Sequence, residues 1–188
     1  EPFELKGSIG GGLRRSGLYL AGEAAKVIAA TVQPMKSPAL RVVQTELRIP
    51  LRPWPRPDAV NDPTKWIKGR PAHRRYYGGA KAEWQQRMAG QNPVPVKVNV
   101  VRIGDAAICT SPAELFVEFG LEIRRHSPAR VTFVSELTDG YCGYVPTKKA
   151  FSRGGYETWP APTSQLAPQA GSQIVAATRQ LLRKTFSA

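Results

Sequence analysis

The chain has 188 residues, enough for one domain with a sizeable core, and 41% of them are hydrophobic, as is usual for a globular protein. The formal net charge is +13, but the basic residues are thinly spread and accompany no nucleic-acid-binding motif, which argues against a nucleic-acid partner. No apolar run approaches the roughly 18–20 residues that span a membrane, and no secretory signal is visible.

The first half of the chain predicts a helix, a strand and an irregular segment. Residues 16–32 have helical apolar spacing, with Leu20 and Ile28 on one face, and residues 40–49 alternate as in a half-buried strand. Residues 50–72 carry six prolines and two tryptophans, which predicts a stiff, irregular excursion that packs against another part of the protein. A short surface helix is expected over 78–90.

From residue 94 onward the pattern is clearer. Residues 94–100 alternate as a strand, and a turn at Gly104 and Asp105 leads into a second strand over 106–109, forming a hairpin. The remaining sequence predicts a helix, a strand, a Gly- and Tyr-rich loop and a closing helix, over residues 111–126, 130–137, 139–147 and 168–186. These elements predict a single domain over 1–188 of the α/β (mixed α+β) class, with a mixed sheet and flanking helices.

The histidines and cysteines form no recognisable metal site on their own. His73 and His126 have no partner at ligand spacing, and His126 suits the C-terminal end of a helix. Cys109 and Cys142 belong to no Cys-x-x-Cys pair, which excludes a finger-type zinc site. Two free thiols are the simpler interpretation, and a disulfide between them cannot be read from the sequence.

Glu114 has two competing interpretations. It ends the stretch Thr110-Ser-Pro-Ala-Glu114, which follows a short apolar strand, and α/β proteins commonly build sites at strand ends. However, Ser111, Pro112 and Glu114 also have the spacing of a capping box at the start of a helix. The local sequence favours the cap and leaves a catalytic carboxylate open.

Three tyrosines follow the last predicted strand. Tyr141 and Tyr144 lie in the segment Thr138-Asp-Gly-Tyr-Cys-Gly-Tyr-Val-Pro-Thr147, and Tyr156 lies in Gly154-Gly-Tyr-Glu157. Plain packing explains such residues, but a phenol also donates to an oxyanion or binds a metal once it is deprotonated. Metal binding requires a strong local cation because a free phenol has a pKa of about 10.

The order of these segments resembles the C-terminal half of the neutral/alkaline non-lysosomal ceramidase family. The resemblance covers about residues 94–185, from Ile103-Gly-Asp-Ala-Ala-Ile-Cys-Thr-Ser-Pro-Ala-Glu114 through the tyrosine segments to Leu166-Ala-Pro-Gln-Ala-Gly171. It implies a truncated part of a larger catalytic domain that hydrolyses the N-acyl bond of ceramide with one zinc ion. The chain begins with Glu1 rather than Met, which also suggests an internal fragment or a processed chain.

The resemblance implies roles for individual residues. Glu114 and Tyr144 take the positions of zinc ligands, and Tyr144 and Tyr156 are catalytic, with Tyr156 contacting the scissile amide or a substrate hydroxyl. Tyr141 and Thr147 line the same loop as substrate-binding residues. The histidine ligands belong to a missing N-terminal part of the domain, so the isolated chain is expected to bind zinc poorly and to be inactive. A secreted, periplasmic or cell-surface location is implied by the resemblance alone.

Two departures from the family pattern indicate a divergent branch and leave the substrate open. Ala113 stands where the family usually has Gly, and Asp139 stands where it often has Asn. The second hypothesis is a non-catalytic binding module in which Glu114 only caps a helix. Its basic 50–90 region would contact an anionic membrane or partner through the densest group of cations: Lys65, Lys68, Arg70, Arg74, Arg75, Lys81 and Arg87.

Overall fold

The structure is a computed structural model that describes residues 9–30, 36–57, 59–67, 71 and 79–187. The chain divides into two compact units, residues 1–38 and 39–188. The first unit contains helix α1 (Ile9–Ala30), which begins earlier than predicted and leaves Leu20 and Ile28 exposed. Of the helices that the structure describes, none combines the length and the apolar character needed to cross a bilayer.

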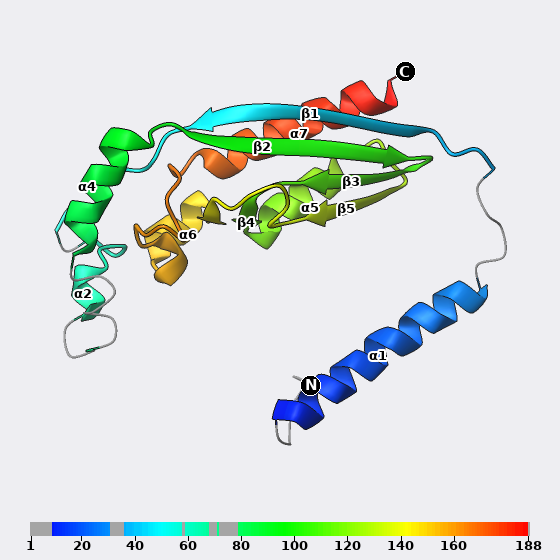
Figure 1. The fold of residues 1–188 in the computed structure, drawn as a ribbon, viewed down its shortest axis with the longest axis horizontal. Coiled ribbons are helices and arrows are strands. Elements are labelled where there is room, and N and C mark those ends of the chain that lie inside the picture. The colour runs from blue at the N-terminus through cyan, green and yellow to red at the C-terminus, as the bar shows by residue number, and fades with distance from the viewer. Residues whose placement is uncertain (1–8, 31–35, 58, 68–70, 72–78, 188) are drawn as a thin grey trace. The chain divides into compact units, whose positions relative to one another are not determined.

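A four-stranded mixed sheet organises the second unit (Figure 1). In spatial order its strands are β1 (Leu40–Ile49), β2 (Val94–Ile103), β3 (Ala106–Thr110) and β5 (Val131–Ser135). The pairs β1–β2 and β2–β3 are antiparallel, whereas β3–β5 is parallel and is connected through helix α5 (Val117–Arg125). The mixed sheet with flanking helices confirms the predicted fold class.

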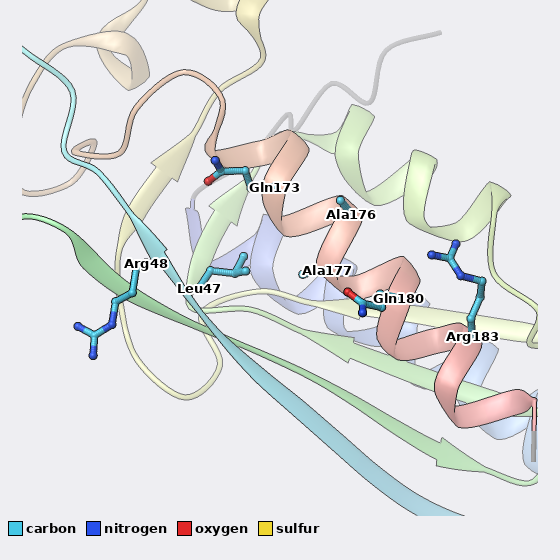
Figure 2. A pocket seen from close by; sticks show the side chains of 7 residues that line it. All are labelled: Leu47, Arg48, Gln173, Ala176, Ala177, Gln180 and Arg183. Atoms are coloured by element: carbon cyan, nitrogen blue, oxygen red, sulfur yellow. The ribbon is translucent and has the colours of Figure 1, made fainter.

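Helices α5 and α7 (Ala170–Phe186) form one hydrophobic core with the sheet. Figure 2 shows Leu47 pointing toward α7 while its neighbour Arg48 points away, as the alternation of a strand requires. The predicted apolar stripe of α7 is confirmed, because each of its members is buried: Ile174, Ala177, Thr178, Leu181 and Leu182. Close packing of α5 on α7 depends on Gly171, since an added Cβ there would overlap the ring of Phe119.

Part of the Pro-rich excursion packs against the rest of the second unit. Beyond helix α2 (Thr64–Ile67), the described residues between 50 and 72 form little regular structure, and α4 (Ala80–Gly90) follows as the expected helix. Trp84 of α4 is buried and donates from Nε1 to the carbonyl of Arg52 at 2.9 Å. The Arg52 guanidinium, whose pKa burial lowers to about 9, donates to the Ser164 carbonyl at 2.7 Å. Together these contacts join the excursion to the segment before α7.

The prediction of a continuous helix over 111–126 was wrong for its first six residues, 111–116. Strand β4 (Ala113–Leu115) occupies this stretch, and α5 begins only after Phe116. A partner strand, β6 (Gly143–Val145), forms inside the predicted loop and pairs with β4 in parallel. The capping box is therefore also wrong, and the buried hydroxyl of Ser111 has no hydrogen-bond partner among the described residues. Backbone pairing with β6 has overridden the local helix-start signal.

Candidate metal and catalytic site

Glu114 and Tyr144 are brought together by the short β4–β6 ladder. The register pairs Ala113 with Gly143, Glu114 with Tyr144, and Leu115 with Val145. Register partners in neighbouring strands present their side chains to the same face, with backbones about 4.8 Å apart. The carboxylate and the phenol therefore rise side by side from one face of this sheet.

The backbone of Tyr144 is held from its other side as well. Its amide donates to the carbonyl of Thr163 at 2.8 Å, and Gly143 forms an antiparallel bridge with Ser164. Gly143 has a φ of +78°, and an added Cβ would overlap the Thr163 carbonyl oxygen. Only glycine fits this close approach, so Gly143 fixes the position of the tyrosine that follows it.

Two further phenols complete the group. The Tyr141 hydroxyl donates to Oε1 of Glu114 at 3.1 Å, and the Tyr156 hydroxyl donates to that of Tyr144 at 3.4 Å. The rings of Tyr144 and Tyr156 meet edge to face, with centroids 5.6 Å apart. We call Glu114, Tyr141, Tyr144 and Tyr156 the tyrosine–glutamate cluster. It gathers four of the five residues that the sequence analysis singled out.

Tyr156 reaches the cluster through the two glycines before it. Gly154 and Gly155 have φ values of +86° and +110°, which side-chain-bearing residues rarely adopt. They turn the chain out of helix α6 (Lys148–Arg153) and into the short 3₁₀ helix η1 (Tyr156–Thr158). The conformational freedom of these glycines thus directs Tyr156 back onto Tyr144.

Thr147 has a different role in the structure. It is the N-cap of α6, and its Oγ1 accepts from the amide of Ala150 at 3.1 Å. The hydroxyl proton is still available for a further partner, because an accepting hydroxyl also donates. Substrate binding by Thr147 stays a prediction, and helix capping is the function that its geometry supports.

Two carboxyl groups, Glu114 in the cluster and Glu136 near it, influence its electrostatics. Hydrogen bonding with Tyr156, and then with the Glu114 carboxylate, raises the pKa of Tyr144 above its ordinary value. Burial raises the pKa of the nearby Glu136 carboxyl, and the charge of Glu114 raises it further. Neighbouring oxygens disfavour each additional negative charge, and a bound cation would reverse this effect. The electrostatics therefore suit a cation held between Glu114 and Tyr144.

We call the Gly- and Tyr-rich segment 139–147 the tyrosine loop. Hydrogen bonds that the sequence analysis did not identify anchor it to the main sheet. The buried amide of Asn99 on β2 donates to Oδ2 of Asp139 and to Oγ1 of Thr110, both at 2.8 Å. Lys97 lies 3.7 Å from the same Asp139 oxygen. Asp139 itself has a positive φ of 61°. A polar Asn between buried valines was the available signal, because a buried amide requires hydrogen-bond partners.

The donor set fits zinc in part. Carboxylate oxygens are established zinc ligands, and a phenol becomes a ligand when a cation removes its proton. Zinc sites in proteins usually have four ligands, of which three or four come from the protein. Among the residues that the structure describes, no group of three or more His, Cys, Asp and Glu side chains gathers at one point. Glu114 and Tyr144 therefore have the chemistry of two zinc ligands, and two donors alone fall short of the usual set.

Other features remain outside the cluster. A hollow of about 540 Å³ between β1 and α7 is lined by Leu47, Arg48, Gln173, Ala176, Ala177, Gln180 and Arg183 (Figure 2). Cys109 and Cys142 are free and buried, in agreement with the simpler interpretation. His126 ends α5 and contacts the Glu122 carbonyl through Nδ1 at 2.9 Å, as expected for a helix-end histidine.

The densest group of basic residues in the 50–90 region is described only in part. The structure does not describe Lys68, Arg70, Arg74 and Arg75, nor His73. Lys65 and Lys81 are exposed, whereas Arg87 donates to Gln165 at 2.9 Å. An anionic partner for the 50–90 region stays a prediction.

Comparison with known proteins identifies the fold. No family model matches the sequence, and no curated protein sequence matches it. Among solved structures, the neutral ceramidase from Pseudomonas aeruginosa matches 98% of this chain with a TM-score of 0.60 at 16% identity. A ceramidase structure described as complexed with C2 matches 94% of the chain with a TM-score of 0.61 at 14% identity.

The fold is thus that of an α/β segment of a larger protein. More specifically, it is the fold of one part of the neutral ceramidase chain, and the predicted relationship to neutral ceramidases is confirmed at the level of structure. The chain spans about a third of the length of each of these ceramidases, 35% and 34% respectively.

Proposed function

We propose that this chain is part of a zinc-dependent, ceramidase-like hydrolase of N-acyl amide bonds, to which it contributes two metal ligands, Glu114 and Tyr144. The observation that carries the proposal is the pairing of these two residues on β4 and β6, which aligns a carboxylate with a phenol. The ceramidase-like fold of the whole segment supports the same reaction class.

Each member of the cluster has a distinct task in this proposal. Glu114 provides a fixed negative charge, oriented by the hydrogen bond from Tyr141. Tyr144 provides a phenol oxygen next to that carboxylate, and Tyr156 donates toward it from the exposed side. When bound, zinc supplies Lewis-acid polarisation of a carbonyl and lowers the pKa of bound water to about 7.

Tyr156 is the best candidate for direct contact with the reacting amide. Tyr156 is 56% exposed, so a substrate can approach it without rearrangement of the core. An amide carbonyl gains negative charge as it is attacked, and a hydroxyl donor directed at that oxygen lowers the barrier. Tyr141, which is 53% exposed and donates to Glu114, is proposed as a substrate-binding residue.

The proposed substrate class is a ceramide-like lipid, cleaved to a sphingoid base and a fatty acid. The test uses the protein expressed from its whole natural reading frame, and it measures fatty acid release from N-acyl sphingoid lipids. We expect a chelator to abolish release, zinc to restore it, and Glu114→Gln to remove it permanently. Hydrolysis that survives both the chelator and Glu114→Gln would rule the proposal out. Glu83→Gln, an exposed glutamate of α4 in the same unit, is the matched control.

A further inference from the structure

At the hairpin end of the four-stranded sheet, the face that does not pack on α5 and α7 carries apolar side chains, although exposed sheet faces are usually polar. The row Val43, Val100, Cys109 and Val134 belongs to the core formed with α5 and α7. The adjacent register positions present their side chains to the opposite face, and at the hairpin end they form two rows: Val42, Val101, Ile108 and Phe133, and then Leu40, Ile103, Ala106 and Val131. We call these eight residues the open apolar face.

The open apolar face is accessible in the second unit. Leu40, Val42 and Phe133 are 73%, 62% and 59% exposed, and Val131 is 47% exposed. A sheet with one solvated face alternates apolar with polar residues, whereas strands covered on both faces are apolar throughout. Contiguous exposed apolar patches on soluble proteins mark interaction surfaces. This end of the sheet therefore has the composition of a buried layer.

The outer edge of β5 continues the same surface. The strand order β1-β2-β3-β5 places β5 last, so its outer edge has no strand partner among the described residues. A hollow of about 450 Å³ runs along this edge between β5 and α5, with Val117 and Leu121 69% and 50% exposed. An uncovered strand edge with apolar flanks is a liability that folded proteins normally cover.

We infer that polypeptide from outside residues 1–188 covers the open apolar face, and that this polypeptide is the counterpart of the remaining two thirds of a ceramidase chain. Two independent observations identify this occupant. The chain aligns over 98% of its own length but over only 35% of the matched ceramidase, so such a protein has ample chain to form a second layer. The cluster also provides only two ligand positions, which makes the chain incomplete without further residues.

The location of the face relative to the site supports this occupant. The next row on the same face is polar, Gln44, Asn99, Thr110 and Ser135, and Asn99 bonds to Asp139 of the tyrosine loop. A layer that covers the open apolar face therefore ends beside the loop that carries Tyr141 and Tyr144. Missing ligands delivered by that layer would enter the site from this side. The inference rests on the proposed function for this last step and for the argument from the two ligand positions, whereas the exposed apolar rows and the partial coverage of the ceramidase chain do not depend on it.

Thiol labelling tests the inference because the native thiols give little background. Cys109 and Cys142 are buried, and burial raises the pKa of each to about 12, so neither reacts readily in the folded chain. Val42→Cys and Phe133→Cys place a new thiol on the open apolar face. Ser172→Cys, on the exposed side of α7, is the control.

We expect both face variants to react with a maleimide as fast as Ser172→Cys in residues 1–188 alone. In the protein expressed from the whole natural reading frame, their rates should fall by at least about tenfold, because reaction then requires local opening. Equal rates in both proteins would overturn the inference, as would a reading frame with no additional polypeptide. Protection of residues 1–188 alone that increases with concentration would overturn it too, because a second copy would then be the occupant.

Two controls keep the result interpretable. If Cys109 or Cys142 is labelled in a face variant, that variant is misfolded, because both thiols are buried in the folded chain. Leu40→Cys, at the end of the sheet, is then used in place of the misfolded variant. Labelling requires neither zinc nor hydrolysis, so a protected face in an inactive protein would count against the proposed function alone.

Discussion

Glu114 and Tyr144 are register partners on two parallel strands, although thirty residues separate them in the sequence. The connection between them contains α5, β5 and the anchored tyrosine loop. Their alignment therefore depends on the long-range structure of the unit rather than on any local turn. Because the ladder has only three register pairs, each pair strongly influences the geometry of the site.

Zinc binding should depend on both partners. We expect the isolated chain to bind zinc weakly, since it fills two ligand positions of the usual four. In the protein of natural length, Tyr144→Phe should lower zinc affinity at least about tenfold, because even residues that only support a metal ligand have effects of that size. Competition with a chromophoric chelator measures both affinities. Tight one-to-one binding by the isolated chain would contradict the proposed division of ligands.

The anchor of the tyrosine loop predicts a contrast between two substitutions of one residue. Asp139→Ala removes the acceptor for Asn99, so amide hydrogen exchange over residues 138–142 should accelerate and turnover should fall. Asp139→Asn keeps an acceptor oxygen and tolerates the positive φ, so it should resemble the unmodified protein. The Lys97 contact that Asn weakens is largely solvated and contributes little. Equal effects of Ala and Asn would instead implicate the charge.

Two glycine substitutions should change stability in opposite directions. Gly143→Ala introduces a Cβ against the Thr163 carbonyl at a positive φ, and we expect a loss on the order of 1–3 kcal/mol in unfolding free energy. Gly120→Ala in α5 meets nothing within 4 Å and should stabilise by roughly 0.5–1 kcal/mol through helix propensity. Urea denaturation of both variants measures the difference. A neutral Gly143→Ala would refute the close approach at Tyr144.

The buried thiols predict a stability that declines in alkali. Burial raises the pKa of Cys109 and Cys142 from 9.0 to about 12, so the folded state keeps protons that the unfolded state releases. Unfolding free energy should therefore fall as the pH rises from about 9 toward 12, and below about pH 9, where both states keep these protons, the thiols should cause no decline. Urea midpoints at pH 8 and pH 10 measure the decline. A Cys109→Ala and Cys142→Ala double variant should show a smaller decline, and an identical one would argue against thiol burial.

Elements with a long, regular hydrophobic period are predictable from this sequence. The alternation over 40–49 and 94–100 predicts β1 and β2, and the stripe around Ile174 predicts α7, because the buried face of each element belongs to one shared hydrophobic core. The start of the helix after Thr110 was mispredicted. There a three-residue ladder with β6 decides the conformation, and its partner lies thirty residues away.

The site was predictable only in part. The residue types in the cluster come from the sequence, but their convergence was expected from the family resemblance rather than from spacing. The sequence places a polar Asn99 between two valines, which signals that its amide needs partners, but it does not show that Asp139 is one of them, because distant segments meet only when the chain folds. The open apolar face is likewise visible only once four strands are in register.

The shortness of the β4–β6 ladder limits how the sequence between its strands can change. Shifting β6 by one position would bring Gly143 or Val145 opposite Glu114, and neither side chain has an oxygen to offer a metal. Such a slip would also direct Tyr144 to the reverse side of the sheet. Insertions and deletions between residues 115 and 143 are therefore tolerated only where they leave the strand alignment untouched, so the pairing of Glu114 with Tyr144 constrains this segment more than its length does.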